Sequence, residues 1–200
     1  MIYQIINKKY MISFYILTHR FKRSMLEITS DTSIDVLWKY LNPLQKNKLP
    51  DIVHFKVSAG KKAYDIIRLY ESGEYFFSKK VIDVLSQFVD MSNKCYPVRI
   101  KDIKEEYYTI YNLQQYPFLN KDKLLGRDEP RFYGVEESSL QLFGIEGTSN
   151  IIVSDEIRLA LLKNKITNIE LIECFGCSRA EYKRIESSNF QPVVHMFRDQ

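Results

Sequence analysis

The first apolar run of the chain, Tyr10 to Leu17, follows Lys8 and Lys9 and is rich in aromatic and branched side chains. It is too short to cross a membrane, which takes about 20 apolar residues. The bulky, basic residues 18–23 come next, where a signal-peptide cleavage site requires small ones. The pattern therefore predicts a buried strand over Ile12–Leu17 and neither a membrane anchor nor a leader.

The second pattern has the period of a helix. Ile34, Leu37, Trp38 and Leu41 are spaced to fall on one stripe of a helix over residues 33–41. Ser33 is suited to the N-cap, and Asn42-Pro43 ends the segment. We expect the whole stripe, Trp38 included, to pack in the core.

Two strand–helix units repeat along the chain. Residues 75–78 are three apolar residues and a serine, and residues 151–154 repeat this pattern about 76 positions later. Apolar residues then follow each serine at three and seven positions. A strand that turns directly into a helix needs a side chain to accept a free N–H of the first turn, so we expect both serines to be N-caps. Each helix returns to an apolar run, at 96–100 and at 169–172.

The remaining segments carry weaker signals. We expect strands at 52–57, 107–113 and 140–145, a short helix at 63–70, and a loop-rich stretch at 114–139. Residues 178–184 suggest a short helix and residues 190–197 a closing strand or tail. Together the patterns predict an α+β protein with a mixed or mainly antiparallel sheet and a few helices.

Length and composition indicate one domain over residues 1–200, within which 1–57 can form an N-terminal subdomain and 58–200 a core. The 200 residues are 45% hydrophobic and 27% charged, as in ordinary globular proteins. The net charge is +4, with basic runs at residues 19–23, 61–62 and 79–80. Acidic residues lie between these runs, so the charges indicate a solvated surface and do not favour nucleic acid as a partner.

Three cysteines, Cys95, Cys174 and Cys177, are too few for a secreted disulfide framework and fit a reducing cytosol. The pair Cys174 and Cys177 forms a single CxxC between a strand candidate and a helix candidate. There a helix dipole lowers a thiol pKa, so a thiol-redox enzyme is one alternative. No second CxxC or His pair completes a zinc site, and we expect structural thiols.

No other catalytic pattern is present in the sequence. His19, His54 and His195 are scattered, and no nucleophile elbow or glycine-rich phosphate loop accompanies them. We therefore expect a binding protein with no cofactor, and no enzyme.

A family resemblance indicates what the chain binds. The segment from Phe143 to Ile157, running on through Leu161 to Glu170, resembles the closing part of a family of bacterial immunity proteins that accompany polymorphic toxins, formerly a domain of unknown function. Residues 75–85 and 107–113 resemble the middle of the same family. The resemblance covers about residues 50–173 and implies a cytoplasmic protein that neutralises a cognate toxin by occlusion. Many such immunity proteins are acidic, and this chain is not.

The resemblance carries over no active-site residues, so the toxin-binding residues are sought in the long loop. Tight inhibitory pairs use aromatic or Arg anchors inside a polar rim, with charges that steer the partner. Residues 126–139 offer both kinds. The candidate anchors are Arg131, Phe132 and Tyr133, and the candidate steering residues are Asp128, Glu129, Glu136 and Glu137. A weakly basic nucleic-acid-binding protein remains a second alternative.

Overall fold

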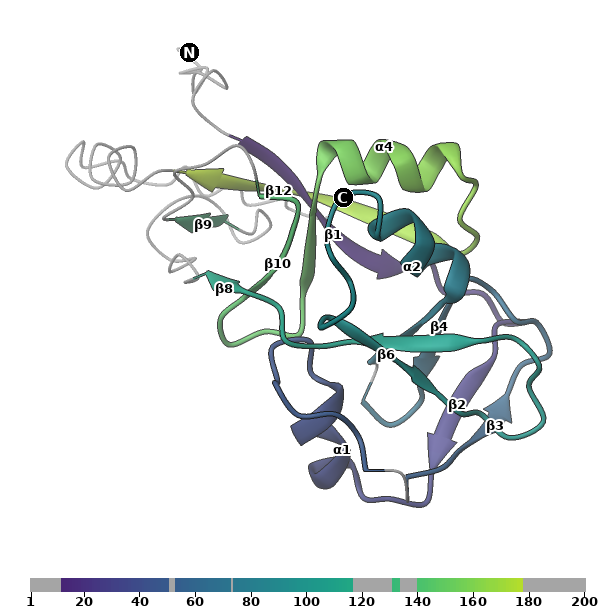
Figure 1. Ribbon diagram of the computed structural model, residues 1–200. Coiled ribbons are helices and arrows are strands. Elements are labelled where there is room, and N and C mark those ends of the chain that lie inside the picture. Colours follow the sequence, from purple (N-terminus) through teal and green to yellow (C-terminus); the bar gives the residue numbers. More distant parts are fainter. Residues whose placement is uncertain (1–11, 51–52, 73, 117–130, 134–139, 178–200) are drawn as a thin grey trace, which may run out of the picture.

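The computed structural model describes residues 12–50, 53–72, 74–116, 131–133 and 140–177. Within them the chain forms two six-stranded sheets and the helices α1 (Ile34–Leu41), α2 (Lys79–Leu85) and α4 (Asp155–Lys163) (Figure 1). Parallel and antiparallel pairs occur in both sheets. The predicted α+β class with a mixed, mainly antiparallel sheet is confirmed.

The first sheet has the strand order β3-β2-β4-β5-β7-β6. In that order the strands are Phe55–Ala59, Glu27–Ser30, Ile66–Leu69, Tyr75–Ser78, Tyr107–Ile110 and Cys95–Val98. The second sheet has the order β8-β10-β11-β1-β12-β9. Its strands are Gln115–Tyr116, Leu142–Ile145, Ile151–Ser154, Ile12–His19, Ile169–Cys177 and Arg131–Tyr133.

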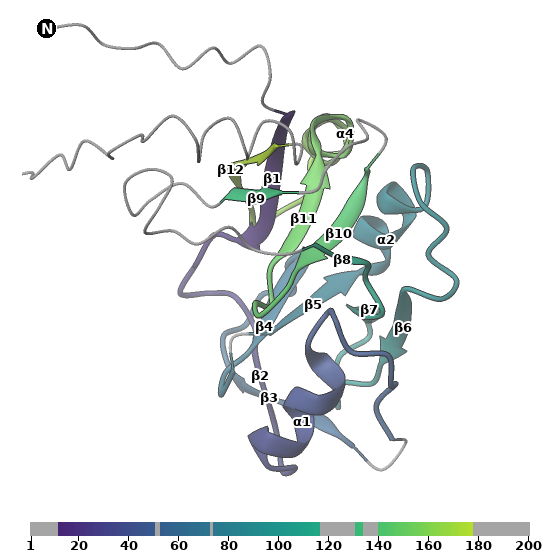
Figure 2. The same ribbon diagram turned by 90° about the vertical axis from the view of Figure 1, so that its left-hand side faces the viewer.

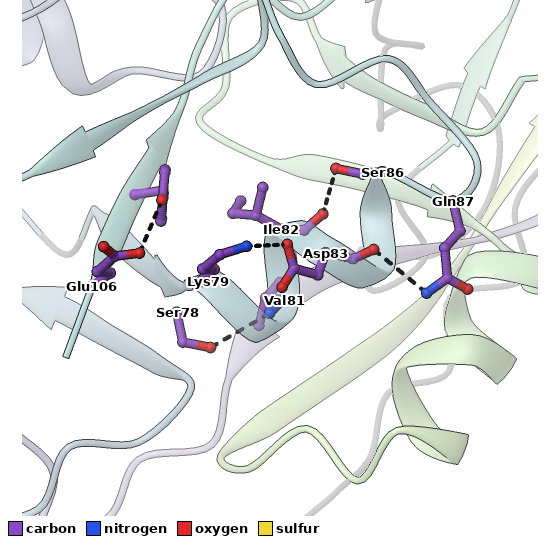
Figure 3. Close-up of polar contacts among 9 residues, drawn as sticks. Ser78, Lys79, Val81, Ile82, Asp83, Ser86, Gln87 and Glu106 are labelled. Carbon is purple, nitrogen blue, oxygen red and sulfur yellow. Dashed lines mark hydrogen bonds and ion pairs between the residues drawn. The ribbon is translucent and has the colours of Figure 1, made fainter.

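Both predicted serine caps are confirmed. The Ser78 hydroxyl accepts a hydrogen bond from the N–H of Val81 at 3.4 Å, at the start of α2 (Figure 3). The Ser154 hydroxyl accepts one from the N–H of Ile157 at 3.3 Å, at the start of α4. Each serine therefore satisfies one of the free N–H groups that a helix leaves at its beginning.

The two strand–helix units are equivalent residue by residue. Adding 76 to each number converts the pair Ile66↔Phe77 of β4–β5 into the pair Leu142↔Val153 of β10–β11. The same shift relates the strands that follow the helices. Ser78 and Val98 both pair with Tyr107 of the strand between them, and Ser154 and Cys174 both pair with Phe14. Residues 65–98 and 141–174 are thus a structural duplication without insertion, although only Ser78/Ser154 and Leu85/Leu161 are identical.

The two sheets differ in the origin of one central strand. In the first sheet, the strand between β5 and β6 is β7, which follows β6 in the chain. In the second sheet, the equivalent place between β11 and β12 is taken by β1, from the beginning of the described chain. Tyr107 of β7 and Phe14 of β1 occupy equivalent positions, opposite Ser78 and Ser154, and both are fully buried.

The largest core joins the two halves. Helices α2 and α4 lie close to one another in both views (Figures 1 and 2). Their buried faces pack with residues from both sheets into one cluster, called the central core below. Its members include Leu17, Ile66, Phe77, Val81, Leu85, Ile110, Leu142, Val153, Ile157 and Leu161. The halves therefore share their hydrophobic interior.

A second core lies on the other face of the first sheet, under α1. It takes Ile67 and Phe76, the neighbours of Ile66 and Phe77 in the same strands. Successive residues of a strand point to opposite faces, so both faces of the first sheet are buried. This explains why the predicted helix at 63–70 is wrong. Strand β4 is apolar on both faces, and such a short continuous run cannot be told from a helix by its period.

Helix α1 confirms the predicted segment but corrects its packing. Only Leu37 and Leu41 are buried, while Trp38 is 44% exposed and Ile34 is also exposed. Ser33 stands at the N-cap position, but its side chain makes no cap hydrogen bond. The helix covers its sheet at one end of the molecule, so a single i,i+4 pair fills the contact and the rest of the stripe faces outward (Figure 1).

Several smaller expectations are resolved or lie outside the described residues. The strand expected at 52–57 is β3, Phe55–Ala59, so the sequence division between residues 57 and 58 falls inside a strand. Strands β7 and β10 lie within the segments predicted for them. The segments 178–184 and 190–197 lie outside the described residues. In the described part of the chain, none of the helices has the length and apolar character needed to span a bilayer.

Candidate functional site

Among the described residues, the predicted anchor segment is the edge strand of the second sheet. Residues Arg131–Tyr133 are β9, the last strand of the second sheet, and pair in parallel with 175–177 at the end of β12. The backbone of these three candidates is thereby placed, and their side chains lie outside what the structure describes. Asp128, Glu129, Glu136 and Glu137 also lie outside the described residues. Their role in binding stays a prediction.

The CxxC lies at the end of strand β12, and the helix expected after it, at residues 178–184, falls outside the described residues. Strand β12 continues through Cys177, so both cysteines lie in extended backbone. Residues three apart in a strand have Cα atoms roughly 10 Å apart. A disulfide needs less than about 7 Å, so these two thiols cannot bridge without moving the strand. Cys174 is fully buried, and burial raises the pKa of its thiol to about 12. Both observations favour a structural thiol.

No metal site is found among the residues whose side chains are described. That part of the chain holds no group of three or more His, Cys, Asp or Glu side chains that could bind an ion. Cys95 is half-buried, and its burial raises the pKa of the thiol. His195 lies outside the described residues.

Two basic runs far apart in the sequence form one surface. The backbone N–H groups of Lys61 and Lys62 donate to the carbonyl oxygen of Ser24 at 3.0 and 2.8 Å. The N–H of Leu26 donates in turn to the carbonyl of Lys62 at 3.1 Å. These bonds hold residues 60–62 against residues 24–26. Exposed cations of both segments therefore share one surface, called the basic surface below: Arg20, Lys22, Arg23, Lys61 and Lys62.

A glycine makes this approach possible. Gly60 has a φ of +79°, and a Cβ built on it would lie 1.8 Å from the carbonyl oxygen of Met25. Only a residue without a side chain fits both the left-handed backbone and the close contact. The position of Lys61 and Lys62 beside residues 22–24 thus depends on Gly60.

One tyrosine ring ties the cations together. The ammonium groups of Lys22 and Lys62 lie 4.8 and 5.0 Å from the centre of the Tyr64 ring, which is buried. The Tyr64 hydroxyl hydrogen bonds with the Ser24 hydroxyl at 3.0 Å. That hydrogen bond, together with the charges of Lys62 and Lys22, lowers the pKa of Tyr64 although burial opposes the change. The Ser24 hydrogen bond is the largest cause of the lowered pKa, and the two ammonium charges add to it.

Phe21 adds an aromatic ring to the basic surface. It is 57% exposed, and the Arg68 guanidinium packs 5.3 Å from its ring centre. Arg68 is itself paired with Glu27 on the neighbouring strand, so its position is fixed. Among the described residues, the five cations of the basic surface make no ion pair. Their charges are available to a partner.

Polar side chains also join the two duplicated units. The Asp65 carboxylate accepts hydrogen bonds from the backbone and hydroxyl of Thr167, both at 2.7 Å, and from the Ser78 hydroxyl at 2.8 Å. Burial alone would raise the pKa of Asp65, but these three hydrogen bonds lower it. The arrangement links the first turn of α2 to the loop before β12. Asp65 is therefore a structural carboxylate.

His19 and Glu74 are titratable groups at the same junction. Both ring nitrogens of His19 are buried without a hydrogen-bond partner among the described residues, and the ring packs 5.1 Å from that of Tyr75. Burial, then the nearby Arg68, lowers the pKa of His19, so it is neutral at pH 7. Glu74 is 5% exposed and hydrogen bonds with Ser149 of the β10–β11 turn, and burial raises its pKa to about 7.

No protein-family model matches the sequence, and a search of curated proteins finds no match either.

The sequence shows the two basic runs of the basic surface, but it does not show that they lie next to each other. The runs 19–23 and 61–62 are visible in the sequence, yet Arg23 and Lys61 are 38 positions apart. The acidic residues between them pointed to a mixed, solvated shell. The one local signal was Gly60 next to Lys61, because a glycine before a charged pair marks a turn that can approach another backbone closely.

Proposed function

We propose that this protein is an immunity protein that binds a cognate bacterial toxin and neutralises it by occlusion. The proposal rests first on the resemblance of residues 75–85, 107–113 and 143–170 to such a family. These segments supply strands and helices of both halves, including the two serine-capped helices. A frame with one shared core suits a protein that works by presenting a fixed surface, because a rigid surface loses little conformational freedom on binding.

The observation that carries the proposal is the place of β9. Among the described residues, the anchor segment Arg131–Tyr133 is the terminal strand of the second sheet and pairs with β12 on one side. A partner can bind an edge strand by pairing an extended segment of its own with it, which adds a strand to the sheet. The backbone hydrogen bonds then give affinity, and alternate side chains give specificity. In this mechanism a toxin segment pairs with β9, and the acidic residues at 128–129 and 136–137 steer a complementary partner toward it.

Protection of cells tests the proposal. Cells expressing the toxin domain encoded beside this chain's gene should survive only when the chain is co-expressed. Phe132→Ala should weaken binding of that toxin, measured by calorimetry, at least about 30-fold if Phe132 is a central anchor. Tyr70→Ala is the matched control, because Tyr70 is 60% exposed on another part of the surface. Failure of the unmodified chain to bind or protect contradicts the proposed function, whereas an unchanged affinity of Phe132→Ala contradicts only the anchor.

A further inference from the structure

The basic surface is uniform in sign and separate from β9. Residues 19–25 and 60–64 contain no acidic side chain. Two nearby carboxylates are engaged, since Glu27 pairs with Arg68 and Asp65 accepts three hydrogen bonds. A third, Glu170 of β12, is exposed and lies near His19. Strand β9 pairs with the part of β12 that faces the Ile12 end of β1, whereas the basic run follows the His19 end. A partner on the basic surface thus leaves the sheet edge free.

We propose that the basic surface binds a single strand of nucleic acid, with its cations on the phosphodiester backbone and Phe21 stacked on a base. Five exposed cations on two adjoining loops match the spread charge of a phosphate backbone. Three of the five are lysines, which contact phosphates as point charges and are depleted at the centres of protein–protein interfaces. The composition therefore favours a phosphodiester chain over an acidic protein face.

Phe21 favours a single strand over a duplex. Its ring is 57% exposed although Arg68 packs against it. Proteins that bind single strands combine a positive surface with aromatic rings on which unpaired bases stack. A base in a duplex is already stacked on its neighbours and does not offer its face.

The surface is held in place before any ligand binds. The hydrogen bonds of Lys61 and Lys62 to Ser24 fix one loop on the other, and Gly60 permits the contact. Lys22 and Lys62 are further restrained by the Tyr64 ring. Binding therefore requires little ordering of the two backbones, which lowers its entropic cost.

Salt dependence of binding tests the phosphate contacts. The probe is a fluorescent oligothymidylate, titrated with the full chain over a series of NaCl concentrations and followed by anisotropy. If all five cations contact phosphates, log K against log salt falls with a slope near −3.5. The double variant Arg23→Gln/Lys61→Gln should flatten this slope by about 1.4, because two contacts are lost. Within the described part of the chain, neither side chain makes a hydrogen bond, an ion pair or a cation–π contact, so the fold should be unaffected.

The matched control has the same change in net charge. Lys39→Gln/Lys46→Gln replaces two exposed lysines on α1 and the loop after it. It should leave the slope unchanged. The proposal would be overturned if the slope flattened as much in this control as in Arg23→Gln/Lys61→Gln, or if it stayed unchanged in the latter. It would also be overturned if the unmodified chain did not bind the oligothymidylate at low salt.

Further probes identify the ligand class. Phe21→Ala should weaken binding of the single strand at least about fivefold and leave a duplex of the same length nearly unaffected. Oligouridylate in place of oligothymidylate distinguishes RNA from DNA. A polyglutamate peptide that displaces the strand at equal charge concentration would instead indicate an acidic protein partner and overturn the proposal. All of these measurements are made without the toxin, so their failure leaves the proposed immunity function untouched.

Discussion

Glu74 shows how a single buried carboxyl couples stability to pH. It lies at the junction of the two hairpin turns, where Ser149 hydrogen bonds with it, and burial raises its pKa to about 7. An ordinary glutamate has a pKa of 4.5. Because the folded pKa exceeds the unfolded one, the folded state binds the extra proton between these values. The contribution of Glu74 to stability is therefore complete below pH 4.5 and is lost as pH rises through 7.

Glu74→Gln should remove this pH dependence. The amide stays neutral, so the variant should be more stable than the unmodified chain at pH 8 by about 3 kcal/mol at most, and similar to it at pH 5. Urea unfolding at the two pH values measures the difference. Glu105→Gln, at an exposed position, is the control and should behave alike at both. If the Glu74→Gln protein and the unmodified chain were equally stable at pH 8, burial would not raise the pKa of Glu74 as described.

At the scale of elements, two short helices depend on the N-cap serine that precedes each of them. Helix α2 has seven residues and α4 has nine, lengths at which an isolated helix does not form in water. Each helix follows an N-cap serine whose hydroxyl also donates a hydrogen bond to a side chain 13 positions earlier. Ser78 donates to the Asp65 carboxylate at 2.8 Å, and Ser154 donates to the Gln141 amide oxygen at 2.6 Å. The hydroxyl thus fixes both the helix start and the beginning of the preceding hairpin strand.

Removing either cap should destabilise the protein to a similar extent. Ser78→Ala and Ser154→Ala should each lower the free energy of unfolding by about 1–2 kcal/mol, because a helix N–H and a strand contact lose their partner. Ser33→Ala supplies the comparison within the same chain, since Ser33 occupies an N-cap position without a cap hydrogen bond. Its effect should stay within about 0.5 kcal/mol. Chemical denaturation of the three variants gives the ranking, and a Ser33→Ala loss as large as the others would refute it.

At the scale of the whole molecule, the two halves should unfold together. The central core contains Val81 and Leu85 from α2 and Ile157 and Leu161 from α4. Either half by itself would therefore expose the side chains that it buries against the other half. The N-terminal strand β1 adds a second constraint. It lies at the centre of the second sheet, hydrogen-bonded to β11 and β12, although its chain continues into the first sheet.

Leucine truncations in the two halves test this cooperativity. Leu85→Ala and Leu161→Ala remove equivalent, fully buried side chains and should each cost about 2–5 kcal/mol. Both should shift one transition, seen at the same denaturant concentration by near-UV and far-UV circular dichroism. Leu159→Ala, at a 52% exposed position on α4, should cost less than about 1 kcal/mol. Two separated transitions in either core variant would show that the halves fold independently.

The sequence by itself determined the elements whose signals are local. A serine between an apolar strand and a helix is a contact over three residues, so the two capped units could be predicted together with the α+β class. The apolar run of β1 was equally readable. Local signals failed in two cases. In β4 both faces of the strand are buried, so its apolar run resembled a helix. On α1 the apolar stripe is wider than the face that packs on the sheet, so Trp38 is exposed.

Only the tertiary structure decided how the units combine. The sequence identifies a repeat, but not that β1 takes in the second sheet the place that β7 takes in the first, because strand pairing joins residues more than 100 positions apart. The basic surface has the same origin: Lys61 and Lys62 meet Ser24 only once β2 and β3 have paired. Charges of one sign separated along a chain become a surface when backbone hydrogen bonds bring their loops together, and no local pattern encodes those bonds.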